Sequence, residues 1–369
     1  MDLDALARSH GQFFVPGFTV LVGGEDLVRD LNLTVTSVEV DLKERAAARF
    51  TFKVANAFSW ELSQFVAGRA EQVVDLIELF AFGAPVDVRI GYGEPASHVP
   101  LLRGLITEIG TSFASGGTPE LTISGYDQLY PLTTGKNTRS WENKPDSVAV
   151  QDIARDYALA AAVTPTQPAK PRIDQSQETD LAFLDKLAKR NRGTTFYLRD
   201  DALYFGPRLN KEGELLELAW GKGLLGFSPE GNLAEQVSTV EVVGRTHQGE
   251  EVIGRATRGD ETRRDSRRES GGERLAAALG EPPLMRVRAA VHTEAEAAAR
   301  AQAILDERAQ QFVTGSLDTI GLPEIRPDIN IKLDGLGTAF SKTYYVSEAT
   351  HTCDASGYRT SCKVQEPTC

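Results

Sequence analysis

The residues of this chain whose types could carry chemistry are few and scattered. Its histidines lie far apart in the sequence, at His10, His98, His247, His292 and His351. A histidine-based triad would therefore have to be assembled without any local signal. The chain also lacks the G-x-x-x-x-G-K-[ST], H-E-x-x-H and G-x-S-x-G patterns, which anchor phosphate, zinc and serine-nucleophile chemistry. We predict that it has no catalytic residues.

One glycine-rich segment, from Gly221 to Gly226, matches the G-x-G-x-x-G dinucleotide fingerprint. In that fingerprint the glycines let the backbone approach a pyrophosphate at a helix N-terminus. Here Pro229 follows closely, so no helix extends from the loop, and no alternation of strands and helices surrounds it. We interpret the match as a coincidence and predict no cofactor-binding residues.

The cysteines, Cys353, Cys362 and Cys369, all lie near the C-terminus, and His351 lies close to the first of them. This neighbourhood suggests zinc, but the spacing matches no common tetrahedral ligand pattern. The residues are better explained as alternating positions of a β-hairpin. An odd number of cysteines favours reduced thiols over a disulfide framework. We predict no metal site.

Carboxylates are uninformative by themselves. A glycosidase needs only two acidic groups beside the scissile bond, and this chain has 52 Asp and Glu residues. A hydrolase acting on peptidoglycan therefore stays open as an alternative, although nothing in the sequence supports it. We predict that the protein is not an enzyme.

Length and composition limit which class of protein this chain can belong to. With 369 residues, 41% hydrophobic and 25% charged, the chain is long enough for two to four ordinary globular domains. No run approaches the 18 apolar residues of a membrane span. The N-terminus opens with acids and lacks a basic segment before an apolar one, so we expect no signal peptide and synthesis in the cytoplasm. The net charge of −12 argues against a general nucleic-acid binder.

The first third of the chain is dominated by apolar residues that alternate with polar ones, which is typical of β-strands. Such runs occur around Val35 to Val54 and Val86 to Ile90, and a slip in phase between Val35 and Val38 predicts a β-bulge. Short strands joined by turn residues indicate a small barrel or sandwich. The apolar stretch from Val73 to Phe82 fits either a helix or a strand.

The middle of the chain changes to helical spacing. One helix is predicted to open at Pro145 to Ser147, and a second to begin at Thr179 and Asp180 and to stop at Gly193. A proline-rich linker, Pro165 to Pro171, is expected between them. A hairpin should follow, with its turn at Asp200 and Asp201.

Strand signals return from Gly221 and are interrupted from about Thr246 to Glu281 by a polar, arginine-rich stretch. Its low hydrophobicity predicts an exposed loop or insertion rather than a nucleic-acid contact. Thr293 and Glu296 then predict a capping box that opens a long helix with Ala298, Ala301, Leu305 and Phe312 on one face, ending near Gly315. The chain ends in a hairpin whose connection, Asp354 to Gly357, is expected to be longer than a two-residue turn.

Four stretches in order carry a resemblance to a known family: Phe80 to Tyr92 leading to Leu102 to Ile106, Leu121 to Asp127, Gln177 to Leu184, and Tyr344 to Val364. Through them the sequence resembles the baseplate-hub family of contractile injection systems. That family includes the phage late control D proteins and the N-terminal portion of the valine-glycine-repeat (VgrG-type) spike proteins. The resemblance spans nearly the whole chain.

The resemblance implies an α+β fold, mainly antiparallel β, with two β-barrel-like tube domains and an intervening α+β domain. Mapped onto this chain, it gives an N-terminal arm (1–14), a first tube domain (15–127), an α+β domain (128–213), a second tube domain (214–245 and 284–369) and a polar insertion (246–283). In the family's terminal motif the matching residues are structural, so the resemblance implies a structural role for His351, Gly357, Tyr358 and Thr360.

The function that the resemblance implies is that of a structural hub in a phage tail or injection particle. A homotrimer would present six similar tube domains and adapt a three-fold central spike to a six-fold inner tube. The implied partners are other copies of the chain, a separate spike protein, the inner tube or its initiator, and other baseplate proteins, with no membrane insertion. Fused spike proteins continue into further barrels, whereas this sequence stops at Cys369. A non-catalytic carbohydrate-binding or adhesion protein is the main alternative.

Overall fold

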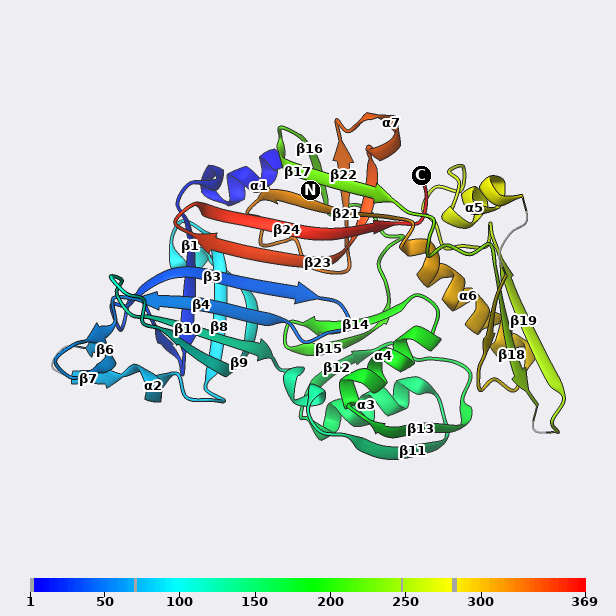
Figure 1. Cartoon of the computed structure of the whole chain (residues 1–369), viewed down its shortest axis with the longest axis horizontal. Coiled ribbons are helices and arrows are strands. Elements are labelled where there is room, and N and C mark those ends of the chain that lie inside the picture. The colour runs from blue at the N-terminus through cyan, green and yellow to red at the C-terminus, as the bar shows by residue number, and fades with distance from the viewer. Residues whose placement is uncertain (1–2, 70–71, 247, 281–283) are drawn as a thin grey trace. The chain divides into compact units, whose positions relative to one another are not determined.

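The computed structural model describes residues 3–69, 72–246, 248–280 and 284–369 (Figure 1). Strands hold 48% of the structure and helices 20%, which confirms the predicted α+β, mainly β, fold class. The residues form two compact units. Unit 1 comprises Met1–Pro131, Asp318–Pro327 and Glu348–Cys362, and unit 2 comprises Leu132–Leu317, Asp328–Ser347 and Lys363–Cys369.

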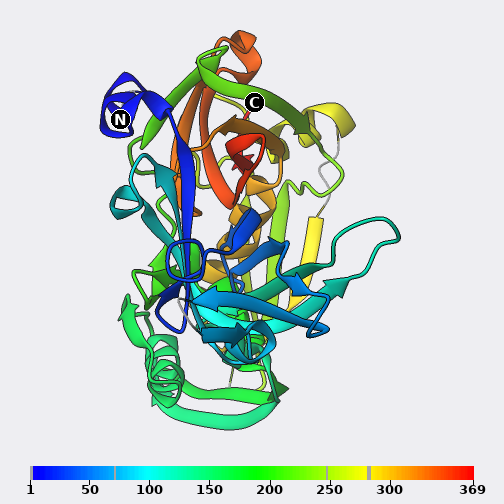
Figure 2. The ribbon, with the colours of Figure 1, turned by 90° about the vertical axis from the view of Figure 1, so that its left-hand side faces the viewer.

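Unit 1 is built on one antiparallel sheet, with the strand order β2-β1-β8-β9-β10-β4-β3, after which β3 pairs with the end of β23. The strands are β1 (Pro16–Val22), β2 (Glu25–Asp26), β3 (Thr34–Lys43), β4 (Arg49–Ala55), β8 (Pro85–Tyr92), β9 (Val99–Ser112), β10 (Glu120–Asp127) and β23 (Lys342–Asp354). The pairing of β3 with β4 shifts register between Val35 and Ser37, so the predicted bulge is confirmed. Strands β9 and β10 project as a long hairpin (Figure 2).

Short elements surround this sheet. They are α1 (Leu3–Ser9), η1 (Gly11–Phe13), β5 (Phe58–Ser59), β6 (Gln64–Arg69), β7 (Gln72–Asp75), α2 (Leu76–Leu79) and η2 (Pro95–Ser97). The stretch that fitted either a helix or a strand is both, because β7 ends at Asp75 and α2 begins at the next residue. The Asp75 carboxylate accepts a hydrogen bond from the Ile77 amide at 2.8 Å and so caps the helix.

A second set of strands closes into a six-stranded barrel, with the order β16-β22-β23-β24-β21-β17 and then β16 again. The strands not yet bounded are β16 (Leu216–Trp220), β17 (Gly223–Gly231), β21 (Val313–Ile320), β22 (Ile329–Asp334) and β24 (Gly357–Glu366), and α7 (Gly337–Phe340) lies between β22 and β23. Residues of β21, β23 and β24 belong to both units. The match to the dinucleotide fingerprint falls at the junction of β16 and β17, so a strand follows it rather than a helix.

The same neighbour order occurs twice in the chain. We number the six barrel strands from one to six in sequence order, beginning with β16. Their order around the barrel is then 1-4-5-6-3-2. The unit 1 strands β1, β3, β4, β8, β9 and β10 follow the same order. Two differences separate the sets. Strands β1 and β8 are antiparallel whereas β16 and β22 are parallel, and β3 pairs with β23 rather than closing on β1.

Unit 2 also contains the predicted helical segment. It holds η3 (Tyr130–Thr133) in part, β11 (Asn137–Lys144), α3 (Asp146–Asp156), β12 (Ala160–Val163), β13 (Lys170–Glu178), α4 (Asp180–Arg190), β14 (Thr194–Arg199) and β15 (Ala202–Pro207). Both predicted helices and the hairpin are confirmed, although α4 ends at Arg190 rather than at Gly193. The proline-rich linker is shorter than expected, because Lys170 and Pro171 already belong to β13, which pairs with the unexpected strand β11.

The remaining elements of unit 2 form a three-stranded sheet covered by a helix. Strands β18 (Thr239–Arg245), β19 (Glu251–Thr257) and β20 (Leu284–Arg288) have the order β19-β18-β20. Helix α6 (Glu294–Gln310) packs on one face, and its contact is close because a Cβ on Gly254 would lie 2.0 Å from the Ala298 amide nitrogen. The buried face of α6 includes Ala297 instead of the expected Ala298, and β21 begins at Val313, before the expected helix end.

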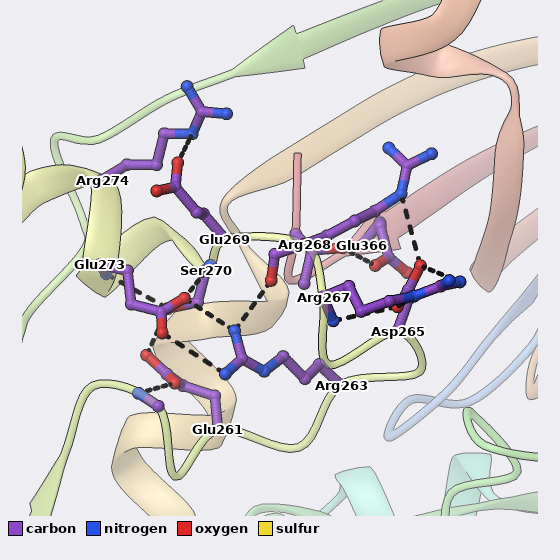
Figure 3. A network of polar contacts seen from close by, with 12 residues as sticks. Glu261, Arg263, Asp265, Arg267, Arg268, Glu269, Ser270, Glu273, Arg274 and Glu366 are labelled. Atoms are coloured by element: carbon purple, nitrogen blue, oxygen red, sulfur yellow. Dashed lines mark hydrogen bonds and ion pairs between the residues drawn. The ribbon is translucent and has the colours of Figure 1, made fainter.

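The stretch from Thr246 to Glu281 was predicted to be an exposed loop or an insertion. The loop is wrong, since β19 and α5 (Gly271–Leu279) lie within this stretch, and the insertion stays a prediction. The alternation in β19 uses the small residues Gly254 and Ala256, which score poorly as strand formers. The segment before α5 is held by a polar network (Figure 3). Arg263 pairs with Glu273 at 2.7 Å, and the Ser270 hydroxyl donates to Glu261 at 2.7 Å.

The terminal hairpin is tighter than expected, because β23 ends at Asp354 and β24 begins at Gly357. The Asp354 carboxylate accepts a hydrogen bond of 2.7 Å from the Ser356 amide, and Gly357 adopts a φ of +111°. The connection between the two strands is therefore two residues long, Ala355 and Ser356. Within the described ranges, no helix combines the length and apolarity that crossing a membrane requires.

Candidate functional site

Polar side chains line one face of the unit 1 sheet, which we call the polar face. Along β3, Val38 and Val40 are fully buried, whereas the intervening Glu39 is exposed. The same alternation continues on the neighbouring strands. The polar face is formed by Ser37, Glu39, Asp41, Lys43, Arg49, Thr51, Lys53, Glu108, Glu120, Thr122, Ser124, Glu348, Thr350, Thr352 and Asp354.

Cross-strand pairs organise this face. Lys43 lies opposite Glu348, and their charged atoms are 2.5 Å apart. The Thr350 hydroxyl donates to Asp41 at 2.7 Å from the next position along β23. Further ion pairs join Arg49 to Glu108 at 3.1 Å and Lys53 to Glu120 at 3.5 Å. Such exposed pairs contribute about 0–1 kcal/mol each, so they order the face more than they stabilise the fold.

Acidic side chains outnumber basic ones on the polar face, and one of them shows the effect of this crowding. The pKa of the Glu39 carboxyl is raised, first by partial burial and then by the negative charge of Asp41 two residues away. The nearby Arg49 opposes the shift only in part. The face is therefore a hydrophilic, mildly acidic surface with hydroxyl groups between its charges.

The candidate zinc residues lie on the opposite, buried side of the same sheet. His351 is fully buried, and both of its ring nitrogens are engaged. Its Nε2 donates to the Ile325 carbonyl at 2.9 Å, and its Nδ1 accepts from the Tyr358 hydroxyl at 2.8 Å. Burial lowers the pKa of His351 to about 3 and raises that of Cys353 to about 11. These contacts explain both residues as part of the core.

Two of the residues carried over from the family resemblance, Tyr358 and Thr360, contact this histidine, whereas Gly357 lies in the turn of the hairpin. A Cβ on Gly321 would lie 2.1 Å from the Tyr358 ring, so only glycine allows the chain to cross there. The Leu322 amide donates to the Thr360 hydroxyl at 3.0 Å. These contacts therefore fix the segment 321–325 against the terminal hairpin.

The other described histidines lie in separate environments. His10 is 2.6 Å from Glu324, His98 is 2.9 Å from the Thr19 hydroxyl, and His292 contacts the Arg245 carbonyl at 2.9 Å. His247 lies outside the described residues. Among the residues that the structure describes, no group of three or more His, Cys, Asp or Glu side chains is arranged to hold a metal ion.

Two buried carboxylates of unit 2, Asp180 and Asp146, each lie at the first position of a helix. Asp180, at the start of α4, accepts hydrogen bonds from Tyr157 at 2.7 Å and Gln175 at 2.6 Å. Asp146, at the start of α3, is paired with Arg190 and accepts from Asn191 at 2.8 Å. Because several donors satisfy each carboxylate, these clusters stabilise the helix starts.

An exposed aromatic cluster occupies another surface of unit 1. The Phe58 ring packs edge-on against Trp60 with centroids 5.0 Å apart and against Phe113 at 5.5 Å. Trp60 is nevertheless 71% exposed and Phe113 61% exposed. Exposed aromatic groups of this kind mark binding surfaces. Sequence reasoning missed the cluster because Phe113 comes from a different hairpin than Phe58 and Trp60.

Comparison with solved structures places the fold among tail proteins. The 43 kDa tail protein of prophage MuSo2 from Shewanella oneidensis matches with a TM-score of 0.70 at 14% identity, covering 95% of this chain and 98% of that one. The tail protein from Neisseria meningitidis MC58 matches with a TM-score of 0.70 at 15% identity, covering 96% and 97%.

A third match is the c3393 protein of E. coli, described as a component of the type VI secretion system with similarity to the T4 bacteriophage tail proteins gp27 and gp5. Its TM-score is 0.54 at 12% identity, covering 95% of this chain and 77% of that one. At these identities the likeness shows a shared fold. No curated protein sequence matches the chain. One family model, described as the Alg8 N-terminal domain, matches residues 15–354. This chain therefore belongs to the Alg8 N-terminal domain family.

Proposed function

We propose that this protein is a structural baseplate hub of a contractile tail or injection particle. In this proposal three copies assemble around a central axis, and the homotrimer adapts a three-fold spike to a six-fold inner tube. The observation that carries the proposal is the repeated strand order of the two six-stranded sets. Two similar β-modules in each chain give six similar docking positions in a trimer.

The polar face has the hydrophilic character expected of a surface that lines a water-filled channel. In a ring built from such modules, the buried side of each sheet packs on its own core, and the polar face is free to line a central passage. Its hydroxyl groups and excess of carboxylates would hydrate the passage and repel acidic cargo. We therefore propose that Glu39, Asp41, Thr350 and Thr352 line the channel.

The proposed role is non-catalytic. Two buried ionisable groups have structural contacts: His351 is held by Tyr358 and Ile325, and Asp180 by Tyr157 and Gln175. The proposed partners are other copies of this chain, a separate spike protein, the inner tube or its initiator, and further baseplate proteins. The proposed location is the baseplate of an assembled phage or phage-tail-like particle.

The molar mass of the purified chain in solution tests the proposal. Light scattering should give three times 40.1 kDa, and electron microscopy of that species should show a ring with a central passage and approximate six-fold symmetry. A stable monomer at micromolar concentration, or a trimer without a passage, would contradict the hub assignment. A zymogram on peptidoglycan should show no clearing zone, and a clearing zone would overturn the non-catalytic role.

The exposed aromatic cluster favours a second candidate function, a carbohydrate-binding or adhesion protein. Sugar rings stack on exposed aromatic faces, and Trp60 offers such a face at the surface of unit 1. A glycan array separates the two functions. Binding of a defined glycan that is lost in W60A, with a monomeric protein, would favour the binding module over the hub.

A further inference from the structure

The β19-β18-β20 sheet of unit 2 has one face that α6 does not cover, which we call the basic face. Register places Glu241 in β18 opposite Arg255 in β19 and Arg286 in β20, and the next row holds Val243 beside Ile253 and Arg288. Arg245, two positions after Val243, lies on the same side of β18. Among the alternate residues, Val240 and Val242 are fully buried on the side of α6.

Charge on the basic face is positive. Glu241 is fully buried and lies between Arg255, with its Nη2 2.7 Å from the carboxylate, and Arg286. Both arginine side chains still expose more than half of their surface, at 66% and 61%. Arg245 and Arg288 are exposed and have no side-chain partner among the described residues. Glu251 lies opposite Arg245 on the same side, so the basic face carries four arginines and two acids, whereas the whole chain has a net charge of −12.

Apolar side chains lie on both sides of the row formed by Arg255, Glu241 and Arg286. Ile253 is 38% exposed and pairs with Val243 in the next row, and Leu284 is 54% exposed and pairs with Thr239 in the row on the other side. Apolar residues surrounded by arginine are typical of protein interfaces, where arginine is enriched relative to the rest of the surface. Arginine also loses less hydration on burial than lysine does, so such a rim tolerates contact with another protein.

Unit 1 carries a surface of complementary character, which we call the acidic patch. It combines Trp60 and Phe113 of the aromatic cluster with the exposed Leu62 and Glu61, and α2, which contacts the β6 strand that pairs with β5, adds the exposed Ile77 and Glu78. Asp75 caps α2 and adds a further carboxylate. The acidic patch therefore offers apolar area with acids beside it, which matches the apolar area with arginines on the basic face.

We propose that the basic face of one copy of this chain docks on the acidic patch of the next copy. Because the two surfaces differ, the contact is head to tail, and repeated contacts of this kind close into a ring when the rotation allows it. The inference rests on the homotrimer of the proposed function and identifies the surfaces that hold it together. The occupant of both surfaces is therefore a second copy of this chain.

Charge reversal tests the pairing without disturbing the fold. The double variant R245E/R288E changes two exposed arginines that have no side-chain partner among the residues the structure describes, and we expect its association to weaken at least tenfold in sedimentation velocity. E61R/E78R should weaken association similarly, and the fourfold variant that combines both changes should restore most of it. R155E/R172E is the control for the charge change itself, since these side chains are 75% and 63% exposed outside both surfaces, and among the described residues each pairs only with a neighbouring aspartate, Asp152 or Asp174.

Cross-linking tests the direction of the contact. In a C369S background, I253C and L62C place thiols on the two surfaces, and a short bismaleimide should link a mixture of the two single variants. Each single variant alone should give no linked dimer, because a head-to-tail contact never brings identical positions together. Links within either single variant would overturn the head-to-tail arrangement.

The outcomes separate this inference from the proposed function. If R245E/R288E remains as trimeric as the wild-type protein, the basic face plays no part in assembly, and the hub function stands without it. If the wild-type chain is monomeric at every concentration tested, the hub function itself fails. Association of the wild-type chain that requires added RNA or anionic vesicles would show that the basic face binds those ligands instead, and it would overturn the proposal.

Discussion

The Tyr358 hydroxyl donates a 2.8 Å hydrogen bond to Nδ1 of His351, and this contact joins the two strands of the terminal hairpin inside the core of unit 1. Both side chains are buried. The second ring nitrogen of His351 holds the Ile325 carbonyl at 2.9 Å, so the imidazole connects the hairpin to the segment that precedes β22.

Removing the Tyr358 hydroxyl should therefore destabilise the protein. In Y358F the buried Nδ1 loses this donor, and we expect the free energy of unfolding to fall by about 1–3 kcal/mol. Y204F is the control, because Tyr204 donates to the Pro207 carbonyl at 2.7 Å in an exposed position. Urea unfolding followed by tryptophan fluorescence gives both values. If both variants lose the same free energy of unfolding, the buried hydrogen bond to His351 contributes no more than the exposed one.

Stability should depend on pH through His351. Its folded pKa, about 3, lies below the ordinary value of 6.5, so the unfolded chain binds a proton that the folded chain does not. Between these two pH values stability rises with pH, by about 1.4 kcal/mol per unit for this group, and it is level above them. H351Q keeps a donor and an acceptor but does not titrate, so its stability should rise less steeply from pH 4 to pH 6. An unchanged slope would contradict the burial of a neutral imidazole.

Close packing of α6 on β19 should make Gly254 intolerant of any side chain. A Cβ there would lie 2.0 Å from the Ala298 amide nitrogen, and backbone cannot move aside cheaply. We expect G254A to lower the free energy of unfolding by about 3 kcal/mol. G213A is the control, because nothing lies within 4 Å of that added atom. Thermal unfolding of both variants checks the difference, and a neutral G254A would show that the helix sits further from the sheet.

The three cysteines should differ in reactivity. Cys353 and Cys362 are each 3% exposed, and burial raises the pKa of both thiols, that of Cys353 to about 11. Cys369 is only partly buried. Titration with a chromogenic disulfide reagent should label one thiol per folded chain within minutes and three in urea. Rapid labelling of three thiols in the native protein would contradict the buried hairpin.

Local patterns predicted most individual elements. Alternation around Val38 and Val40 predicted strands, and Asp146, Thr179 and Thr293 correctly indicated three helix starts, because caps and periodicity act within a few residues. The failures were also local. Ser270 and Glu273 form a capping box that opens α5, but the arginine-rich composition around them had suggested a loop.

The candidate surfaces could not be predicted in the same way. Glu39 is recognisable in the sequence as an outward strand position, but its neighbour Thr352 comes from β23, near the other end of the chain. The basic face likewise unites β18 and β20 around Glu241, across a stretch that sequence reasoning took for a loop. Surface character depends on which strands become neighbours, and short-range patterns do not encode that.

By itself, the sequence determined that this protein is mainly β, where most strands and helices lie, and that its chemistry-bearing residues are dispersed, because these properties follow from residue spacing and composition. Only the tertiary structure decided that two sets of six strands share one neighbour order, that His351 is a buried structural residue, and that arginines gather on one sheet face. The reason is physical: strand pairing joins residues hundreds of positions apart, and it is the collective burial of both sheets, rather than any local preference, that selects the partners.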